Sequence, residues 1–428
     1  MPNILAPTIS RALFGGVFDI DGAGHYPGLE LINFIVSSPD GILPQGDKVK
    51  IVRVAHDFAR RLISDETLPQ NIRREVLIDE RSENAVSRLL KCLELEIANT
   101  VKAKSWGRTH FFPYTRSLVH WDARLRNSGG QSRILTERLY FRGGGAYAFS
   151  VLRRDPKAKR LERIRSGFGG LYPEDGKSPL DLLAATLKKC GLIEAPVVDH
   201  IEAESQLFND KWEELYRDGV DNILGHVSSS TVERVRAIVT WTGLWLVFMI
   251  AGRSASLLGK PMCYLVLDCA NMHSQLRRAS QRSYKDQLVG IEKLALGKAQ
   301  SLGGQLSGQQ LGKMRGFFGN TAVACGLGNA WKGRRHFMLR LEALETLVMA
   351  GLPAGKEMDF ERFITEWLFA RCGLVIGRHA AGKADLLKDL DATIFEENER
   401  NLADQMQSTG MLKVYSDATR MVSAGDER

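Results

Sequence analysis

The chain has 428 residues, of which 44% are hydrophobic and 25% are charged. These values are ordinary for globular proteins, so they exclude wholesale disorder and leave room for two or three domains with separate cores. The six cysteines are scattered without a CxxC pair, which argues against a disulfide framework or a cysteine-rich zinc site and predicts a reducing, cytoplasmic location. The first residues also lack the basic, apolar and small-residue order of a secretory signal.

Residues 1–150 are expected to form a mixed α/β region. From Lys48 to about Lys104 the hydrophobic spacing is mostly that of helices. Ile134–Phe141 is predicted to be a strand or a short helix, and it leads into three glycines at 143–145. The segment AYAFSVLRR that follows them has helical spacing.

Residues 151–335 are expected to form a basic, mostly helical central region. Ala237–Gly252 is sixteen residues long, contains no charge and is flanked by arginines. A membrane span needs roughly 17–25 apolar residues, so a buried core helix is favoured and no membrane association is expected. Pro261–Asn271 is apolar and predicts a buried strand, whereas Ser301–Gly312 is rich in Gly, Ser and Gln and predicts a flexible loop.

Residues 336–428 have the clearest helical periodicity in the chain. A first helix is predicted from the spacing of Leu341, Leu344 and Leu347, and a second from the apolar positions between Phe360 and Leu368. A third is predicted from about Ile394 to Ser408, and the segment MLKVYSDATRMV reads as two short strands around a turn. Three helices followed by a hairpin resemble a winged-helix domain, on pattern alone.

The resemblance implies that the third helix enters the major groove of DNA. That helix carries four acidic residues against Arg400 alone; the four are Glu396, Glu397, Glu399 and Asp404. Phosphates would repel it, so this domain is predicted to dock a protein. The predicted fold class is α+β and predominantly helical, with a mixed N-terminal and central body followed by a winged-helix-like C-terminal domain.

The net charge of +8 is unevenly distributed along the chain. Residues 336–428 hold 11 basic and 16 acidic residues, a net charge of −5, so the first 335 residues carry +13. Residues 142–165 have a net charge of +6 and residues 271–335 one of +9. Basic segments of this kind usually face a polyanion, because each neutralised phosphate releases counterions.

Aromatic side chains lie between these charges and suit stacking on unpaired bases. We therefore predict a nucleic-acid surface that contacts mainly the backbone, with DNA as the first candidate, formed by Arg142, Arg153, Arg154, Lys157, Arg160, Arg277, Arg278, Arg282, Lys285, Arg315, Phe317, Trp331, Arg334 and Arg335. The alternative is that the rings belong to the core and the arginines meet solvent or an acidic protein partner.

Three segments come close to known catalytic or binding motifs. The segment VFDIDG, with Asp19 and Asp21, resembles the aspartate loop of haloacid-dehalogenase phosphatases, but Ala23 stands where that family has Thr or Val. The segment GRHAAGKA matches GxxxxGK but has Ala384 where a P-loop needs Ser or Thr for Mg²⁺. The glycines at 143–145 could open an anion site or simply allow a tight turn.

These features favour a non-catalytic, nucleic-acid-binding accessory subunit of a bacterial multi-protein complex, in DNA processing or phage defence by analogy. Its C-terminal domain would dock a protein partner such as an ATPase or a nuclease, and no cofactor or metal is expected. Two alternatives stay open. One is a metal-dependent phosphatase or nuclease that uses Asp19 and Asp21, with Asp268 as a possible third carboxylate. The other is an adaptor that binds only protein.

Overall fold

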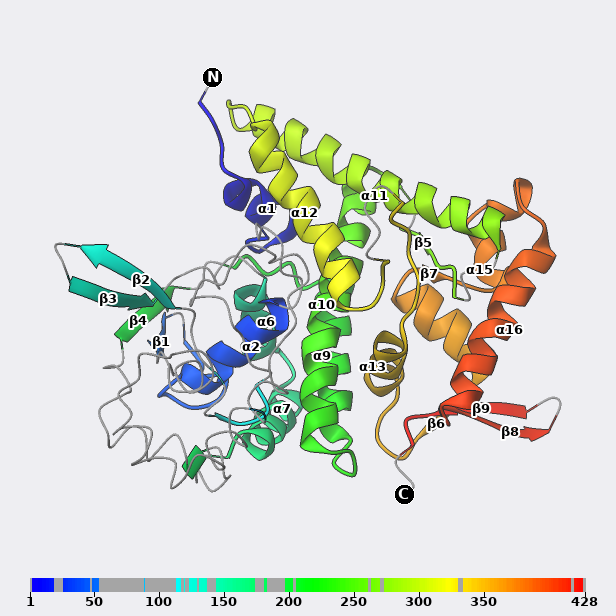
Figure 1. Cartoon of the computed structure of the whole chain (residues 1–428), viewed down its shortest axis with the longest axis horizontal. Helices are drawn as coiled ribbons and strands as arrows, with labels where there is room; N and C mark the ends of the chain where they lie inside the picture. The colour runs from blue at the N-terminus through cyan, green and yellow to red at the C-terminus, as the bar shows by residue number, and fades with distance from the viewer. Residues whose placement is uncertain are drawn as a thin grey trace. The chain divides into compact units, whose positions relative to one another are not determined.

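The computed structural model describes residues 2–18, 26–46, 48–53, 88, 113–116, 119, 123–128, 131–136, 144–173, 181–182, 197–202, 205–260, 263–269, 273–329, 334–416 and 419–425. The described residues are mostly helical with a few short strands (Figure 1), which confirms the predicted α+β, predominantly helical class. The chain divides into two compact units. Unit 1 comprises residues 1–28, 142–151 and 205–428, and unit 2 comprises residues 29–141 and 152–204.

These units do not coincide with the three consecutive regions expected from the sequence. The N-terminal helix α1 (Ala6–Phe14) belongs to unit 1, where it contacts three helices that lie more than 200 residues later in the chain. Those helices are α10 (Thr231–Leu257), α11 (Ser274–Ser301) and α12 (Gly308–Ala324). Hydrophobic spacing identifies each helix but carries no information about which distant helix it will pack against.

Helix α10 is the centre of unit 1. It packs against α1, α11 and α12, and also against α9 (Lys211–Gly225) and α13 (Leu341–Gly351). A capping box fixes its start, because the Ser230 side chain accepts a hydrogen bond from the Glu233 N–H and the Glu233 carboxylate accepts one from the Ser230 N–H.

The uncharged part of α10 is almost wholly buried, which confirms the prediction of a core helix for Ala237–Gly252. Among the described helices, α10 alone is long and apolar enough to cross a membrane, but 89% of its most apolar window is buried inside the protein. Neighbouring helices surround α10, so it has no single apolar face and its hydrophobic residues point in all directions.

An arginine near the end of α10 joins four separate segments of unit 1. Arg253 Nε and Nη2 lie 2.8 and 3.0 Å from carboxylate oxygens of Asp210 and Glu213, and Nη1 donates to the Phe14 carbonyl at 2.6 Å. Nη1 also donates to the Tyr147 hydroxyl at 2.8 Å, and that hydroxyl donates to Glu213 at 2.6 Å. The guanidinium is thus buried with its charge compensated and its hydrogen bonds made.

The C-terminal part of unit 1 contains the three helices and the hairpin that the sequence predicted. Its elements are α13, β6 (Glu357–Asp359), α14 (Phe360–Arg362), a π-helical segment (Phe363–Arg371), β7 (Leu374–Val375), α15 (Arg378–Lys383), a 3₁₀ turn (Leu386–Lys388), α16 (Ala392–Ser408), β8 (Leu412–Ser416) and β9 (Thr419–Ser423). Strands β6, β9 and β8 form an antiparallel sheet in that order. The second predicted helix widens to π geometry, so the Cys372 N–H bonds to the Trp367 carbonyl five residues back. The resemblance to a winged helix stays a prediction.

Two sequence expectations in the central region are corrected. The strand expected over Pro261–Asn271 is reduced to β5 (Leu265–Val266), which pairs in parallel with β7, although residues 261–262 and 270–272 lie outside the described residues. The loop expected at Ser301–Gly312 is shorter than predicted and comprises residues 302–307, because α11 ends at Ser301 and α12 begins at Gly308. Ser307 caps α12, and the backbone of Gln305 bonds to the N-terminal segment.

In unit 2, β1 (Lys48–Arg53) pairs antiparallel with β4 (Val197–Glu202), and β2 (Ala123–Ser128) with β3 (Gln131–Thr136). The helices are α7 (Ala158–Leu171) and most of α2 (Tyr26–Ser37), whereas α6 (Gly145–Arg153) lies mostly in unit 1. The start of the region expected to be helical from Lys48 is therefore a strand, because Val49 and Ile51 alternate inward with period two. Strand β3 covers the beginning of the element predicted at 134–141.

Candidate nucleic-acid interface

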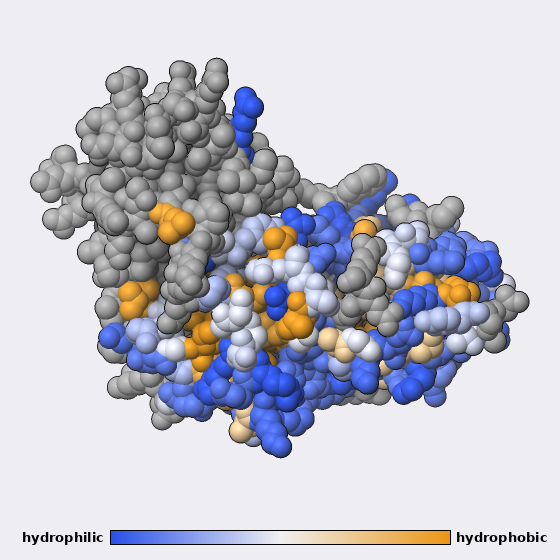
Figure 2. All heavy atoms as spheres, turned by 90° about the horizontal axis from the view of Figure 1, so that it is seen from below, coloured by the Kyte–Doolittle hydropathy of each residue, from blue (hydrophilic) through white to orange (hydrophobic). Residues whose placement is uncertain are grey.

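Helix α11 carries a row of exposed basic side chains along one side. Arg278, Arg282, Lys285 and Lys293 are all exposed. They follow one another at positions i, i+4, i+7 and i+15, and these spacings return to the same side of an α-helix. We call these four residues the basic stripe. In the view of Figure 2, hydrophilic residues cover much of the described surface of the protein.

The opposite side of α11 fixes the helix to the core. Ser280 Oγ donates to the Phe337 carbonyl at 2.9 Å and accepts from the Phe337 N–H at 2.8 Å. Ser283 Oγ donates to the Tyr264 carbonyl at 2.9 Å and accepts from the Val266 N–H at 3.3 Å. These buried serines replace apolar residues in the helical pattern, so α11 is held by hydrogen bonds to two extended segments and presents its stripe from a rigid support.

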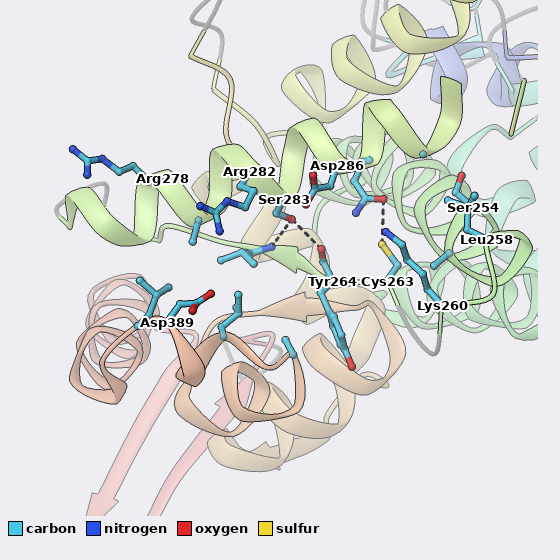
Figure 3. Close-up of a pocket in the computed structure, with 18 of the residues that line it drawn as sticks. Ser254, Leu258, Lys260, Cys263, Tyr264, Arg278, Arg282, Ser283, Asp286 and Asp389 are labelled. Atoms are coloured by element: carbon cyan, nitrogen blue, oxygen red, sulfur yellow. Dashed lines mark hydrogen bonds between the residues drawn. The ribbon is translucent and has the colours of Figure 1, made fainter. Parts of the chain in front are cut away.

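A cavity of about 590 Å³ lies beside the basic stripe. Its walls are the end of α10, the segment that leads into β5, α11 and residues 384–390 (Figure 3). Cavities that bind small ligands usually measure about 300–1,000 Å³. Arg278 and Arg282 belong to both features, because the cavity wall of α11 is adjacent to the side that carries the stripe.

Five charged side chains line this cavity: Lys260, Arg278, Arg282, Asp286 and Asp389. Figure 3 shows Arg278, Arg282 and Asp286 on α11, with Lys260 and Asp389 on other segments. Among the described residues, none of the five forms an ion pair within 4.0 Å. Three cations and two carboxylates therefore remain available to a ligand.

The end of the cavity at α10 contains buried polar groups. Ser254 is 2% exposed, and its Oγ makes no hydrogen bond within the described part of the chain. Cys263 Sγ donates to Gln287 Oε1 at 3.4 Å, and burial raises the pKa of the thiol to about 12, so the thiol stays protonated. The thiol is therefore a poor nucleophile at neutral pH.

Several predicted basic residues of unit 1 already have protein partners. Arg277 Nε lies 3.6 Å from Asp268 Oδ2, and Arg315 lies 3.2 Å from Glu292. Arg335 donates to the Tyr284 hydroxyl at 3.4 Å and to Asn320 Oδ1 at 3.2 Å. Arg334, by contrast, is exposed.

The aromatic side chains do not form the base-stacking surface that the sequence suggested. Phe317 is 3% exposed and its ring centroid lies 5.4 Å from that of Phe18, so Phe317 is a core residue and cannot stack on a base. Tyr284 is likewise buried, against Phe337. Trp331 lies outside the described residues. The apolar periodicity of α12 explains the correction, because it places Phe317 on the side that faces the core.

Two of the predicted basic residues of unit 2 make buried contacts within that unit. Arg160 forms two hydrogen bonds to Asp155, at 2.5 and 2.8 Å, and Arg153 donates to the Gly46 carbonyl at 2.5 Å. Both arginines are buried and are withdrawn from the proposed surface. Lys157 is exposed and Arg154 half-buried, whereas Arg142 lies outside the described residues. Two of the eight basic residues of the +6 segment are therefore buried structural residues, whereas Lys157, Lys159 and Arg163 are exposed.

The near-miss motifs are not assembled into a site within the described residues. Asp19 and Asp21 fall outside them, and the described residues contain no group of three or more His, Cys, Asp or Glu side chains that could hold a metal ion. Asp268 is buried beside Arg277. At the glycine triplet, Gly144 has a φ of 85° and packs against Leu246 and Phe18, which fits the tight-turn interpretation.

The GRHAAGKA segment differs from a phosphate-binding loop in its backbone. Helix α15 begins immediately after Gly377, and the Ala381 N–H already bonds to the Gly377 carbonyl. In a P-loop these residues form an open loop whose N–H groups point at phosphate. The helical backbone therefore leaves the N–H groups of Ala381 and Ala384 bonded to carbonyls of the chain.

Five residues of the site were missed by the sequence prediction, namely Ser254, Lys260, Asp286, Lys293 and Asp389. Lys293 could have been found, because its spacing from Arg278 extends the row of basic residues along the same helix side. No sequence pattern indicated that Lys260 and Asp389 belong to the site, because they lie on segments that are distant from α11 in the sequence. No protein-family model matches the chain, and no curated protein or solved structure is significantly similar to it.

Proposed function

We propose that this protein is a non-catalytic, nucleic-acid-binding accessory subunit of a bacterial multi-protein complex. The observation that carries the proposal is the basic stripe of α11. With a rise of 1.5 Å per residue, the stripe from Arg278 to Lys293 extends over about 22 Å, long enough to follow several phosphates of one strand. Its side chains reach solvent without an ion pair to a described residue.

The proposed contacts of the basic stripe are to the backbone of DNA and carry no sequence preference. Long, flexible Lys and Arg side chains on one side of a helix suit phosphate oxygens, which have the same spacing for every base. The C-terminal region has a net charge of −5 and its helix α16 exposes acidic side chains. We propose that this region docks a protein partner, such as an ATPase or a nuclease, instead of entering a DNA groove.

The test compares two variants that lose the same charge. The stripe variant changes Arg278, Arg282, Lys285 and Lys293 to Ala. The control variant changes four exposed basic residues of the C-terminal region to Ala, namely Arg340, Lys356, Arg362 and Arg400. Fluorescence anisotropy with labelled single- and double-stranded DNA, over a salt series, measures the dissociation constant of each protein.

We expect wild type and control to bind with a steep salt dependence. The stripe variant is expected to bind roughly 100-fold more weakly at low salt, with a log–log salt slope shallower by about 3 to 4, because each lost phosphate contact removes about 0.9 from the slope. Equal weakening in both variants would mean that general charge, not the stripe, binds DNA. No binding by wild type at low salt would favour the adaptor that binds only protein.

A further inference from the structure

We propose that the cavity beside the basic stripe binds a single nucleotide whose base carries an exocyclic amino group, such as cytidine monophosphate. The inference rests on the proposed function, because Arg278 and Arg282 serve both the stripe and the cavity. The cavity volume of about 590 Å³ is ample for a nucleotide. The nucleotide is either free or one residue of a bound strand.

The charges around the cavity match the two ends of such a ligand. Arg278 and Arg282 lie one turn apart on α11 and border the stripe, so a phosphate bound between them can continue into the path of a strand. Asp286 follows one further turn along the same wall, and Asp389 lies on the opposite wall (Figure 3). A carboxylate accepts hydrogen bonds from an exocyclic amino group but repels a carbonyl oxygen, so these residues favour cytosine over uracil.

The far end of the cavity supplies hydrogen-bond donors. Lys260 and Ser254 line the end at α10, away from Arg278 (Figure 3). The Ser254 hydroxyl is buried and makes no hydrogen bond to any described residue, which is costly unless another group satisfies it. A base carbonyl bound there would accept from Lys260. A simple inorganic anion would use only the arginine end and would make no contact with Lys260 at the far end.

The first experiment measures binding of cytidine monophosphate, uridine monophosphate and inorganic phosphate by isothermal titration calorimetry. Cytidine monophosphate is expected to bind about tenfold more tightly than uridine monophosphate, and inorganic phosphate more weakly than both. The preference for cytosine should disappear in a variant with Asp286→Ala and Asp389→Ala. Lys260→Ala and Arg282→Ala should each weaken binding of cytidine monophosphate by about tenfold or more. These four side chains are exposed, so thermal unfolding should show little change.

A control separates the cavity from the stripe. Lys285 and Lys293 belong to the stripe but do not line the cavity, and Lys260 lines the cavity but is not on the stripe. A Lys285→Ala, Lys293→Ala variant should therefore bind the mononucleotide as wild type does while losing affinity for DNA. Lys260→Ala should have the opposite profile. If the stripe does not bind DNA, binding of the mononucleotide in the cavity can still be observed. If the cavity does not bind a nucleotide, binding of DNA by the stripe can still be observed.

The source of the nucleotide is decided by a second measurement with oligonucleotides rich in cytosine or uracil. In one outcome, wild type prefers the cytosine-rich strand, Lys260→Ala loses that preference, and free cytidine monophosphate does not bind. This outcome means that the cavity binds a residue of the strand. Binding of free cytidine monophosphate that is lost in Lys260→Ala assigns it to a mononucleotide. The proposal is overturned if neither ligand responds to Lys260→Ala, or if inorganic phosphate binds as tightly as the nucleotide.

Discussion

Replacement of Arg253 by methionine is expected to lower the free energy of unfolding by about 3 kcal/mol, because it removes one of the two arginines beside the buried Glu213 carboxylate and leaves only Arg217, at 3.6 Å. Glu213 is fully buried, and it shares the guanidinium with the Tyr147 hydroxyl and with Asp210. Methionine fills much of the arginine volume, so the loss of charge dominates over the loss of packing. Urea unfolding followed by circular dichroism measures the effect.

The pH dependence of the same variant gives an independent measurement. Burial acts to raise the pKa of Asp210, but the hydrogen bond and charge of Arg253 outweigh burial and hold that pKa below its ordinary value. A carboxyl with a lowered folded-state pKa stabilises the protein above its unfolded-state pKa, and this contribution is lost as the pH falls through the folded-state pKa. Without Arg253 the folded-state pKa of Asp210 rises toward its unfolded-state value, so the variant lacks this contribution at neutral pH, and the difference in unfolding free energy between wild type and variant should narrow as the pH falls through the folded-state pKa of wild type.

The matched control is Arg362→Met, which removes an arginine that pairs with Glu366 at the surface, at 2.9 Å. Solvent screens this pair, so little change in unfolding free energy is expected. If Arg253→Met and Arg362→Met lowered the free energy of unfolding by the same small amount, the buried contacts of Arg253 would contribute no more to stability than a surface ion pair does.

Replacement of Gly252 by alanine is expected to destabilise unit 1 by about 3 kcal/mol, although alanine is the better helix former. A Cβ at this position would lie 1.9 Å from Trp212 Cζ2 and 2.3 Å from Cε2. The indole of Trp212 belongs to α9, which packs against α10, so the side chain cannot yield without separating the two helices. The melting temperature and the free energy of unfolding measure the effect.

Gly297→Ala provides the opposite case within the same unit. Gly297 lies inside α11, and a Cβ there would meet no atom within 4 Å. Alanine should therefore stabilise the protein by about 0.5–1 kcal/mol through helix propensity alone. A similar, stabilising effect of both substitutions would show that α9 and α10 are not in close contact at Gly252.

Local elements could be predicted correctly wherever one hydrophobic periodicity dominated. Ala237–Gly252 was predicted as a core helix, and the apolar spacing around Phe360 and Ile394 located two C-terminal helices, because the alternation of apolar and polar residues is a local property of the chain. Short strands were predicted less accurately from the sequence. Residues 48–53 form a strand because they pair with 197–202, a contact that no local pattern records.

The availability of charged and aromatic residues for binding depends on tertiary contacts and could not be predicted from the sequence. The sequence treats Arg160 and Arg282 alike, yet Arg160 is buried against Asp155 while Arg282 is exposed beside the cavity. Phe317 turned from a stacking candidate into a core residue for the same reason. Burial and ion pairing depend on neighbours from distant parts of the chain, so the cavity, and the approach of Asp389 to it, could not be predicted from composition or spacing.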